Sequence, residues 1–193
     1  MKIAVITGSP HRHGTSAYLA DQFIKGAEEA GHSVFRFDAG LEPLHPCLGC
    51  DKCGTSGVCI HRDGIQKLIP HLMEAEIVVF ATPLYYFGMS AQLKTVIDRF
   101  YSINYKLMGS GKRALLLATA YDDKDWTFQA LVTHYKTVVQ YLEWADGGQL
   151  LAGGCGSRGD IENSKFGEQA YQMGKELSCK LSENDASFVV ASN

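Results

Sequence analysis

Apolar residues along this chain follow two alternating patterns, short continuous runs and longer stripes at helical spacing. The runs predict five β-strands, the last of them weak, at residues 3–7, 33–37, 77–82, 114–119 and 149–152. The third and fourth runs are apolar at almost every position, which is typical of parallel strands covered on both faces. The pattern therefore favours a buried parallel sheet.

Between the runs, apolar residues recur every three or four positions, which predicts amphipathic helices. Gly31 is placed to end the first helix, and Pro70 is expected to bend or shorten the second. We interpret all five stripes as core packing; they lie within residues 20–27, 65–72, 89–100, 128–142 and 166–177.

Five alternating strand–helix units predict an α/β fold with helices on both faces of the sheet. The expected architecture is a flavodoxin-like three-layer sandwich, a five-stranded parallel sheet with strand order 2-1-3-4-5. In such sheets, ligands bind at the carboxyl ends of strands one and three, where flavodoxin holds FMN. We expect one domain at residues 1–182, including a cysteine-rich loop at 46–60, and a loosely held tail at 183–193.

Composition narrows the class of protein. The chain has 193 residues, 46% of them hydrophobic, which suits one globular domain. The net charge is −3 and no basic block stands out, so we expect no nucleic-acid partner. No apolar stretch reaches the roughly 18 residues of a membrane span, so we expect no membrane association. We predict a cytoplasmic protein, in which cysteines are reduced or bound to metal.

The loop after the first strand is rich in groups that bind phosphate. Hydroxyls, a fixed charge and two glycines precede a helix, whose first N–H groups are free and carry partial positive charge. An ordinary strand-to-helix turn capped by Ser or Thr is the alternative. The candidate phosphate-binding residues are Ser9, Pro10, His11, Arg12, Gly14, Thr15 and Ser16.

The segment after the third strand carries three consecutive aromatic residues, which are hard to explain as core on a loop. They could form a flat apolar wall for an aromatic ring, with Gly88 admitting the ring edge to backbone N–H groups. An aromatic patch at an oligomer interface is the alternative, and the two roles are compatible. Ala120 and Tyr121, after the fourth strand, should reach the same pocket. The candidate ring-binding residues are Pro83, Leu84, Tyr85, Tyr86, Phe87 and Gly88.

Four cysteines, Cys47, Cys50, Cys53 and Cys59, follow the spacing C-x2-C-x2-C-x5-C. Such short runs suit a [4Fe–4S] cluster, since successive thiolates can converge on one centre. Zinc and metal-free thiols remain open alternatives. The cysteine segment follows the second strand and so begins at the carboxyl end of the sheet. We therefore expect it on the same side of the molecule as the phosphate loop.

Three segments, 8–16, 82–100 and 47–59, together resemble the NAD(P)H-dependent FMN reductases, including the iron–sulfur flavoproteins. This resemblance implies bound FMN, NAD(P)H as co-substrate and, through the third segment, a [4Fe–4S] cluster. The family often has arginine where this chain has His11, and Asn-Thr where it has Thr15 and Ser16. These departures preserve hydrogen-bond donors but leave open which side chain meets the phosphate.

The expected function is that of an FMN-dependent oxidoreductase, which takes hydride from NAD(P)H and passes electrons to a quinone, a flavin, a metal or a protein. The flavin carries the chemistry, so no catalytic side chain is assigned. An iron–sulfur and FMN electron carrier without pyridine-nucleotide activity is the alternative. The exposed aromatics also predict a homodimer or a higher homo-oligomer, in which a second subunit covers part of the flavin.

Overall fold

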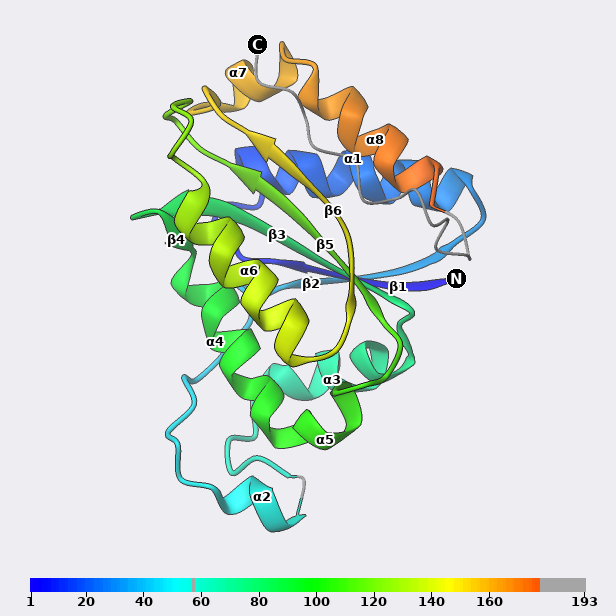
Figure 1. The fold of residues 1–193 in the computed structure, drawn as a ribbon, viewed down its shortest axis with the longest axis vertical. Coiled ribbons are helices and arrows are strands. Elements are labelled where there is room, and N and C mark those ends of the chain that lie inside the picture. Colours follow the sequence, from blue (N-terminus) through cyan, green and yellow to red (C-terminus); the bar gives the residue numbers. More distant parts are fainter. Residues whose placement is uncertain (57, 178–193) are drawn as a thin grey trace.

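A computed structural model describes residues 1–56 and 58–177, so the predicted tail at 183–193 lies outside the described residues. Strands and helices alternate as the apolar pattern predicts (Figure 1). The strands are β1 Lys2–Thr7, β2 Ser33–Asp38, β3 Ile77–Tyr85, β4 Gly88–Met89, β5 Arg113–Thr119 and β6 Ala145–Ala152. The helices are α1 Thr15–Glu29, α2 Lys52–Ser56, α3 Ile65–Glu74, α4 Ala91–Arg99, η1 Phe100–Ile103, α5 Asn104–Leu107, α6 Gln129–Tyr141, α7 Arg158–Glu162 and α8 Phe166–Lys175.

The sheet has the order β2-β1-β3-β5-β6, and each pair in this path is parallel. Because β4 is a two-residue strand paired antiparallel with β3, outside this path, the order is the 2-1-3-4-5 predicted from the sequence. The fold class is therefore confirmed. The last strand is longer than its apolar run at 149–152, since β6 begins at Ala145. Its pairing with β5 is irregular between Ala114 and Leu116.

Alternate residues of the central strands feed two separate cores, one on each face of the sheet. Ala4, Val78 and Leu116 pack with α3, α4 and α6, whereas Val5 and Val79 pack with α1 and α8. Figure 1 shows α1 and α8 side by side on one face, with α4 and α6 on the other. Side chains alternate across a strand, so continuously apolar runs are what two helical layers require.

Of the two residues predicted to end or interrupt a helix, Gly31 does so and Pro70 does not shorten its helix. Gly31 follows α1 with a φ of +81°, and the N–H of His32 donates to Ala27 O at 3.0 Å, a glycine-based helix stop as predicted. Pro70 does not shorten α3, which continues to Glu74. Pro70 is exposed, so water can serve the carbonyl that lacks its usual N–H partner. No helix in the described ranges is long and apolar enough to cross a bilayer.

Candidate functional site

A hollow of about 330 Å³ lies at the carboxyl edge of the sheet, where the segments after β1, β3, β5 and β6 meet. This is the switch point of the strand order, at which doubly wound sheets bind ligands. Nine residues predicted from the sequence line it, namely Ser9, His11, Gly14, Thr15, Pro83, Leu84, Tyr85, Ala120 and Tyr121. The hollow thus unites the three segments that sequence analysis assigned to one site.

The polar corner of this hollow is the start of α1. Gly14 precedes the helix, no side chain caps it, and its first turn holds no acidic residue. The side chain of Ser9 turns back on its own loop, where its Oγ accepts from the N–H of His11 at 3.1 Å. The hydroxyl of Ser16 is buried and has no hydrogen-bond partner among the described residues. Free N–H groups and an orphaned hydroxyl at a helix N-terminus form a site suited to an anion.

The segment after β3 is not the open loop that the sequence analysis assumed. β3 continues to Tyr85, and Leu84 pairs with Met89, so 84–89 is a tight hairpin with Tyr86 and Phe87 at its turn. Both turn residues have positive φ, +46° and +64°. Such turns normally use Asn and Gly, because a bulky side chain is strained there. The apolar and aromatic residues favoured strand pairing over a loop.

This hairpin presents its aromatic rings to the outside. Tyr86 is fully exposed, and Phe87 is 42% exposed and packs on Trp126 with ring centroids 5.0 Å apart. Tyr121, which also lines the hollow, is 87% exposed. The mouth of the hollow is therefore rimmed by aromatic surface.

One serine joins the two halves of the site. The Oγ of Ser90 donates to Gly8 O at 2.7 Å, and its N–H donates to the Oγ1 of Thr82 at 3.0 Å. A Cβ on Gly8 would lie 2.4 Å from that Oγ. Gly8 thus permits close approach of another part of the protein. The loop after β1 and the hairpin after β3 are held in a fixed relation.

Six predicted residues do not line the hollow. Arg12, Tyr86 and Phe87 are exposed, Pro10 and Gly88 are partly buried, and Ser16 lies beneath the surface of the corner. Four lining residues were not predicted, namely Thr119, Cys155, Gly156 and Arg158. Three of these follow β6, whose carboxyl end reaches the same edge as the other strands. The only signal in the sequence was the glycine-rich stretch after the weak fifth run.

The cysteine segment leaves the sheet edge at which it begins. α2 contacts η1, which follows α4, so α2 lies at the far end of α4 from β4 (Figure 1). The expectation that the cysteines share a side with the phosphate loop is wrong within one chain. Among the described residues, the thiols are free, with Cys47 and Cys50 exposed and Cys53 and Cys59 partly buried. Burial raises the pKa of the Cys53 thiol, and the charges of Cys59, Cys47 and Cys50 raise it further. In the described part of the chain, no three of these sulfur atoms lie within 4.8 Å of one another.

A buried ion pair closes the base of this segment. Arg99, at the end of α4, donates from Nη1 and Nη2 to the two carboxylate oxygens of Asp63 at 2.9 and 3.1 Å. Its Nη1 also donates to His45 O at 2.8 Å, so it holds both ends of the cysteine segment. Burial alone would raise the pKa of Asp63, but hydrogen bonds from Arg99 and His45 outweigh it and hold that pKa far below its usual range. His61 stacks on His45, and with Asp63 these three could hold a metal ion, although Arg99 already occupies the carboxylate.

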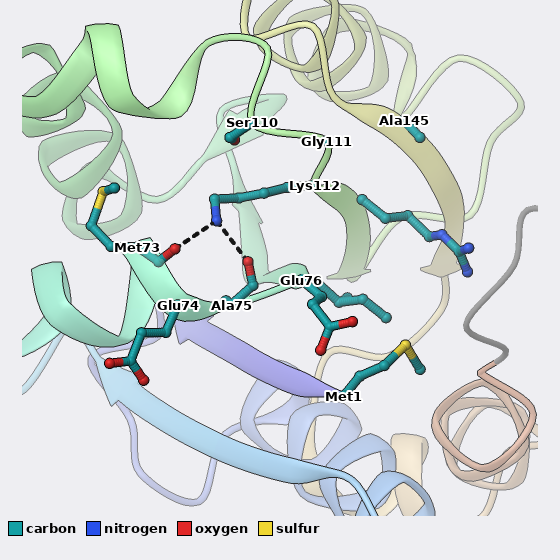
Figure 2. A pocket seen from close by; sticks show the side chains of 11 residues that line it. Met1, Met73, Glu74, Ala75, Glu76, Ser110, Gly111, Lys112 and Ala145 are labelled. Atoms are coloured by element: carbon teal, nitrogen blue, oxygen red, sulfur yellow. Dashed lines mark hydrogen bonds between the residues drawn. The ribbon is translucent and has the colours of Figure 1, made fainter.

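A second hollow, of about 380 Å³, lies at the opposite, amino edge of the sheet. Figure 2 shows Lys112 at its centre, with Nζ directed at the carbonyls of Met73 and Ala75 at 3.0 and 2.6 Å. Lys112 is buried, which lowers the pKa of its amine. These carbonyls end α3, so the lysine serves as a cap for that helix. The lysine at the centre of this second hollow is therefore explained by its role in capping α3.

The fold and the carboxyl-edge hollow together define a flavodoxin-like protein with an anion corner beside an aromatic wall. A family model described as NADPH-dependent FMN reductase matches residues 1–148. The chain therefore belongs to the NADPH-dependent FMN reductase family, which confirms the resemblance seen in its motifs.

Several known proteins are similar to this chain. An iron–sulfur flavoprotein of Archaeoglobus fulgidus is 32% identical over 112 residues, 58% of this chain and 51% of that protein, so the chain spans about half its length. The iron–sulfur flavoprotein MJ1083 of Methanocaldococcus jannaschii is 26% identical over 184 residues, 92% of this chain and 95% of that protein. The structure of an NAD(P)H:quinone oxidoreductase from Methanothermobacter marburgensis superimposes with a TM-score of 0.73 at 18% identity, covering 93% of this chain and 97% of that one. At that identity, the likeness shows the fold alone.

The residues of the hollow fit FMN. The orphaned Ser16 hydroxyl and the uncapped start of α1 suit one phosphate. Pro83, Leu84 and Tyr85 supply an apolar wall in the same hollow, which Tyr121 also lines. This combination matches a flavin mononucleotide, which has one phosphate and one flat ring.

Proposed function

We propose that this protein is an FMN-dependent oxidoreductase that takes hydride from NAD(P)H and passes electrons to a separate acceptor. The observation that carries this proposal is the single hollow in which the uncapped start of α1 meets the wall formed by Pro83, Leu84 and Tyr85. FMN supplies the redox chemistry when bound, so the protein's task is binding and orientation. The acceptor is a quinone, a flavin, a metal or a protein.

The chain's own residues have two roles in this proposal. The N–H groups at the start of α1 and the hydroxyl of Ser16 hold the phosphate, since they are donors at a helix N-terminus. The hydroxyl of Ser9 bonds to His11 and holds the shape of the loop that precedes them. The hairpin and Tyr121 flank the ring and leave its edge open to a nicotinamide or an acceptor. The bond between Ser90 and Gly8 fixes the distance between the two parts.

The exposed aromatics support a homodimer or a larger homo-oligomer, as expected from the sequence. Tyr86 and Phe87 are held by a strained turn, in which Tyr86 is fully exposed and Phe87 is 42% exposed. Such rings, together with Trp126, are typical of an interface core. A second copy placed there would close the mouth of the hollow. Light scattering at micromolar concentration tests this, and a monomer would reject it.

The four-cysteine segment supports a [4Fe–4S] cluster as a second cofactor. Four cysteines within thirteen residues form a suitable donor set, and a relative named iron–sulfur flavoprotein is 26% identical over 92% of this chain. Zinc and metal-free thiols remain alternatives. Since α2 lies at the far end of α4, electron exchange with the hollow would need a second copy or a partner protein. Anaerobically prepared protein should hold about four irons and four sulfides per chain.

An electron carrier without pyridine-nucleotide activity is the second candidate, favoured by the cysteine segment. Steady-state oxidation of NADPH and NADH by FMN-loaded protein separates the two. Turnover with a quinone or free flavin as acceptor is expected for the reductase. Protein that binds FMN but does not oxidise either nucleotide is the carrier instead. Release of FAD on denaturation, or no flavin binding, would reject both.

A further inference from the structure

Arg158 is a charged residue of the hollow that neither the motifs nor the family match identifies. It lines the hollow together with Ser9 and Thr15, yet the family model ends at residue 148. Arg12, the arginine that sequence analysis assigned to the phosphate, is exposed and outside the lining. The hollow therefore has a fixed cation, supplied from a distant part of the chain.

The guanidinium of Arg158 lies beside the first turn of α1. Its Cζ is 4.6 Å from the ring centre of Tyr18, the fourth residue of that helix. Its Nη1 lies 3.5 Å from His13 O, just before the helix begins. Contacts on both sides of the helix start place the charge at the anion corner.

This placement is electrostatically unfavourable unless an anion is present. A helix N-terminus carries partial positive charge, and cations are normally found at the other end. The first turn of α1 holds no acidic residue that would compensate. Glu162 accepts from the Nε of Arg158 at 2.6 Å and offsets part of the charge, but this pair is about 40% exposed and therefore screened. An anionic group between Arg158 and the helix start would satisfy both positive partners.

We propose that Arg158 recognises the phosphate of the flavin and so distinguishes FMN from riboflavin. The inference rests on the proposed FMN site and names the residue that binds the phosphate of FMN there. Arginine suits this role because its planar fork matches phosphate geometry and it is always charged. It would also supply the cation that the family often has at the position of His11.

The test measures affinity of the apoprotein for FMN and for riboflavin, by quenching of flavin fluorescence. The variant Arg158→Gln keeps length and polarity but removes the charge. A hydrogen bond to a charged group is worth enough to predict a loss of about 10- to 30-fold in FMN affinity. Riboflavin lacks the phosphate, so its affinity should change by less than about 2-fold on the same basis.

Three further variants keep the result interpretable. Glu162→Gln removes the ion pair but leaves Arg158, so it should retain or strengthen FMN binding. Arg62→Gln, the same substitution at an exposed arginine away from the hollow, should change neither affinity. Arg12→Gln tests the assignment made from sequence and should cost less FMN affinity than Arg158→Gln.

Equal loss of FMN and riboflavin binding in Arg158→Gln would mean that Arg158 only packs against Tyr18, and would overturn the proposal. No change in either affinity, or an FMN-specific loss in Arg12→Gln alone, would overturn it as well. In these cases the wild type still binds FMN and the proposed function stands. Wild-type protein that binds neither flavin would instead reject the FMN site itself.

Discussion

The ion pair between Asp63 and Arg99 is expected to control both the stability of the protein and its response to acid. Their side chains are 3% and 1% exposed, and Arg99 joins Asp63 to the backbone of His45. Asp63→Asn keeps the shape but leaves the guanidinium buried without a counter-charge. Removal of one partner from a buried pair costs about 3–5 kcal/mol, a large part of the roughly 5–15 kcal/mol that stabilises a typical domain.

The sign of the pH effect follows from the lowered pKa of Asp63. In the unfolded chain this carboxyl titrates near its ordinary value of about 3.9, and in the folded protein much lower. Its stabilising contribution is therefore complete above about pH 4 and declines below it, by at most about 1.4 kcal/mol per pH unit. Asp63→Asn should lose this acid-dependent part.

Urea unfolding at pH 6, 4 and 3 measures both effects. The matched control is Glu74→Gln, which removes an ion pair with Lys2 whose side chains are 60% exposed, and the midpoint should stay where it was. Since the pair also holds the ends of the cysteine segment, Asp63→Asn should speed limited proteolysis within residues 46–60. A variant with wild-type stability at pH 6 and a wild-type pH slope would refute the reasoning.

Three other substitutions probe the turn, the phosphate corner and the amino edge. At concentrations where the protein is monomeric, Tyr86→Asn should stabilise the chain by about 0.5–1 kcal/mol, since Asn tolerates positive φ and the ring is fully exposed within one chain. Tyr105→Asn, at an 89% exposed helical residue, should not, and chemical denaturation compares the two variants. Ser16→Ala should leave the apoprotein as stable as before, because its buried hydroxyl has no partner, but weaken FMN binding by about 5- to 10-fold. Lys112→Met should lower the free energy of unfolding by about 2–4 kcal/mol, since it orphans the carbonyls of Met73 and Ala75; unchanged stability would contradict the cap.

Local sequence was enough to predict the frame of this protein. The apolar runs and stripes predicted five parallel strands, two helical layers and the strand order. They did so because burial on one face or two imposes a period that each segment carries by itself. The rule that ligands bind at the switch point then predicted a common site for the segments after β1, β3 and β5. Four residues of 9–16, together with 83–85 and 120–121, do line one hollow.

Tertiary structure alone decided the details that depend on distant segments. The sequence offered Arg12 as the phosphate cation, but the fold turns that residue outward and brings in Arg158, 146 positions later by their numbers. The sequence also did not show that the cysteine segment runs to the far end of α4, since that path depends on the pairing of Asp63 with Arg99. Periodicity records how deeply each residue is buried, whereas contacts between remote residues depend on how the layers close around the sheet, and no local pattern carries that information.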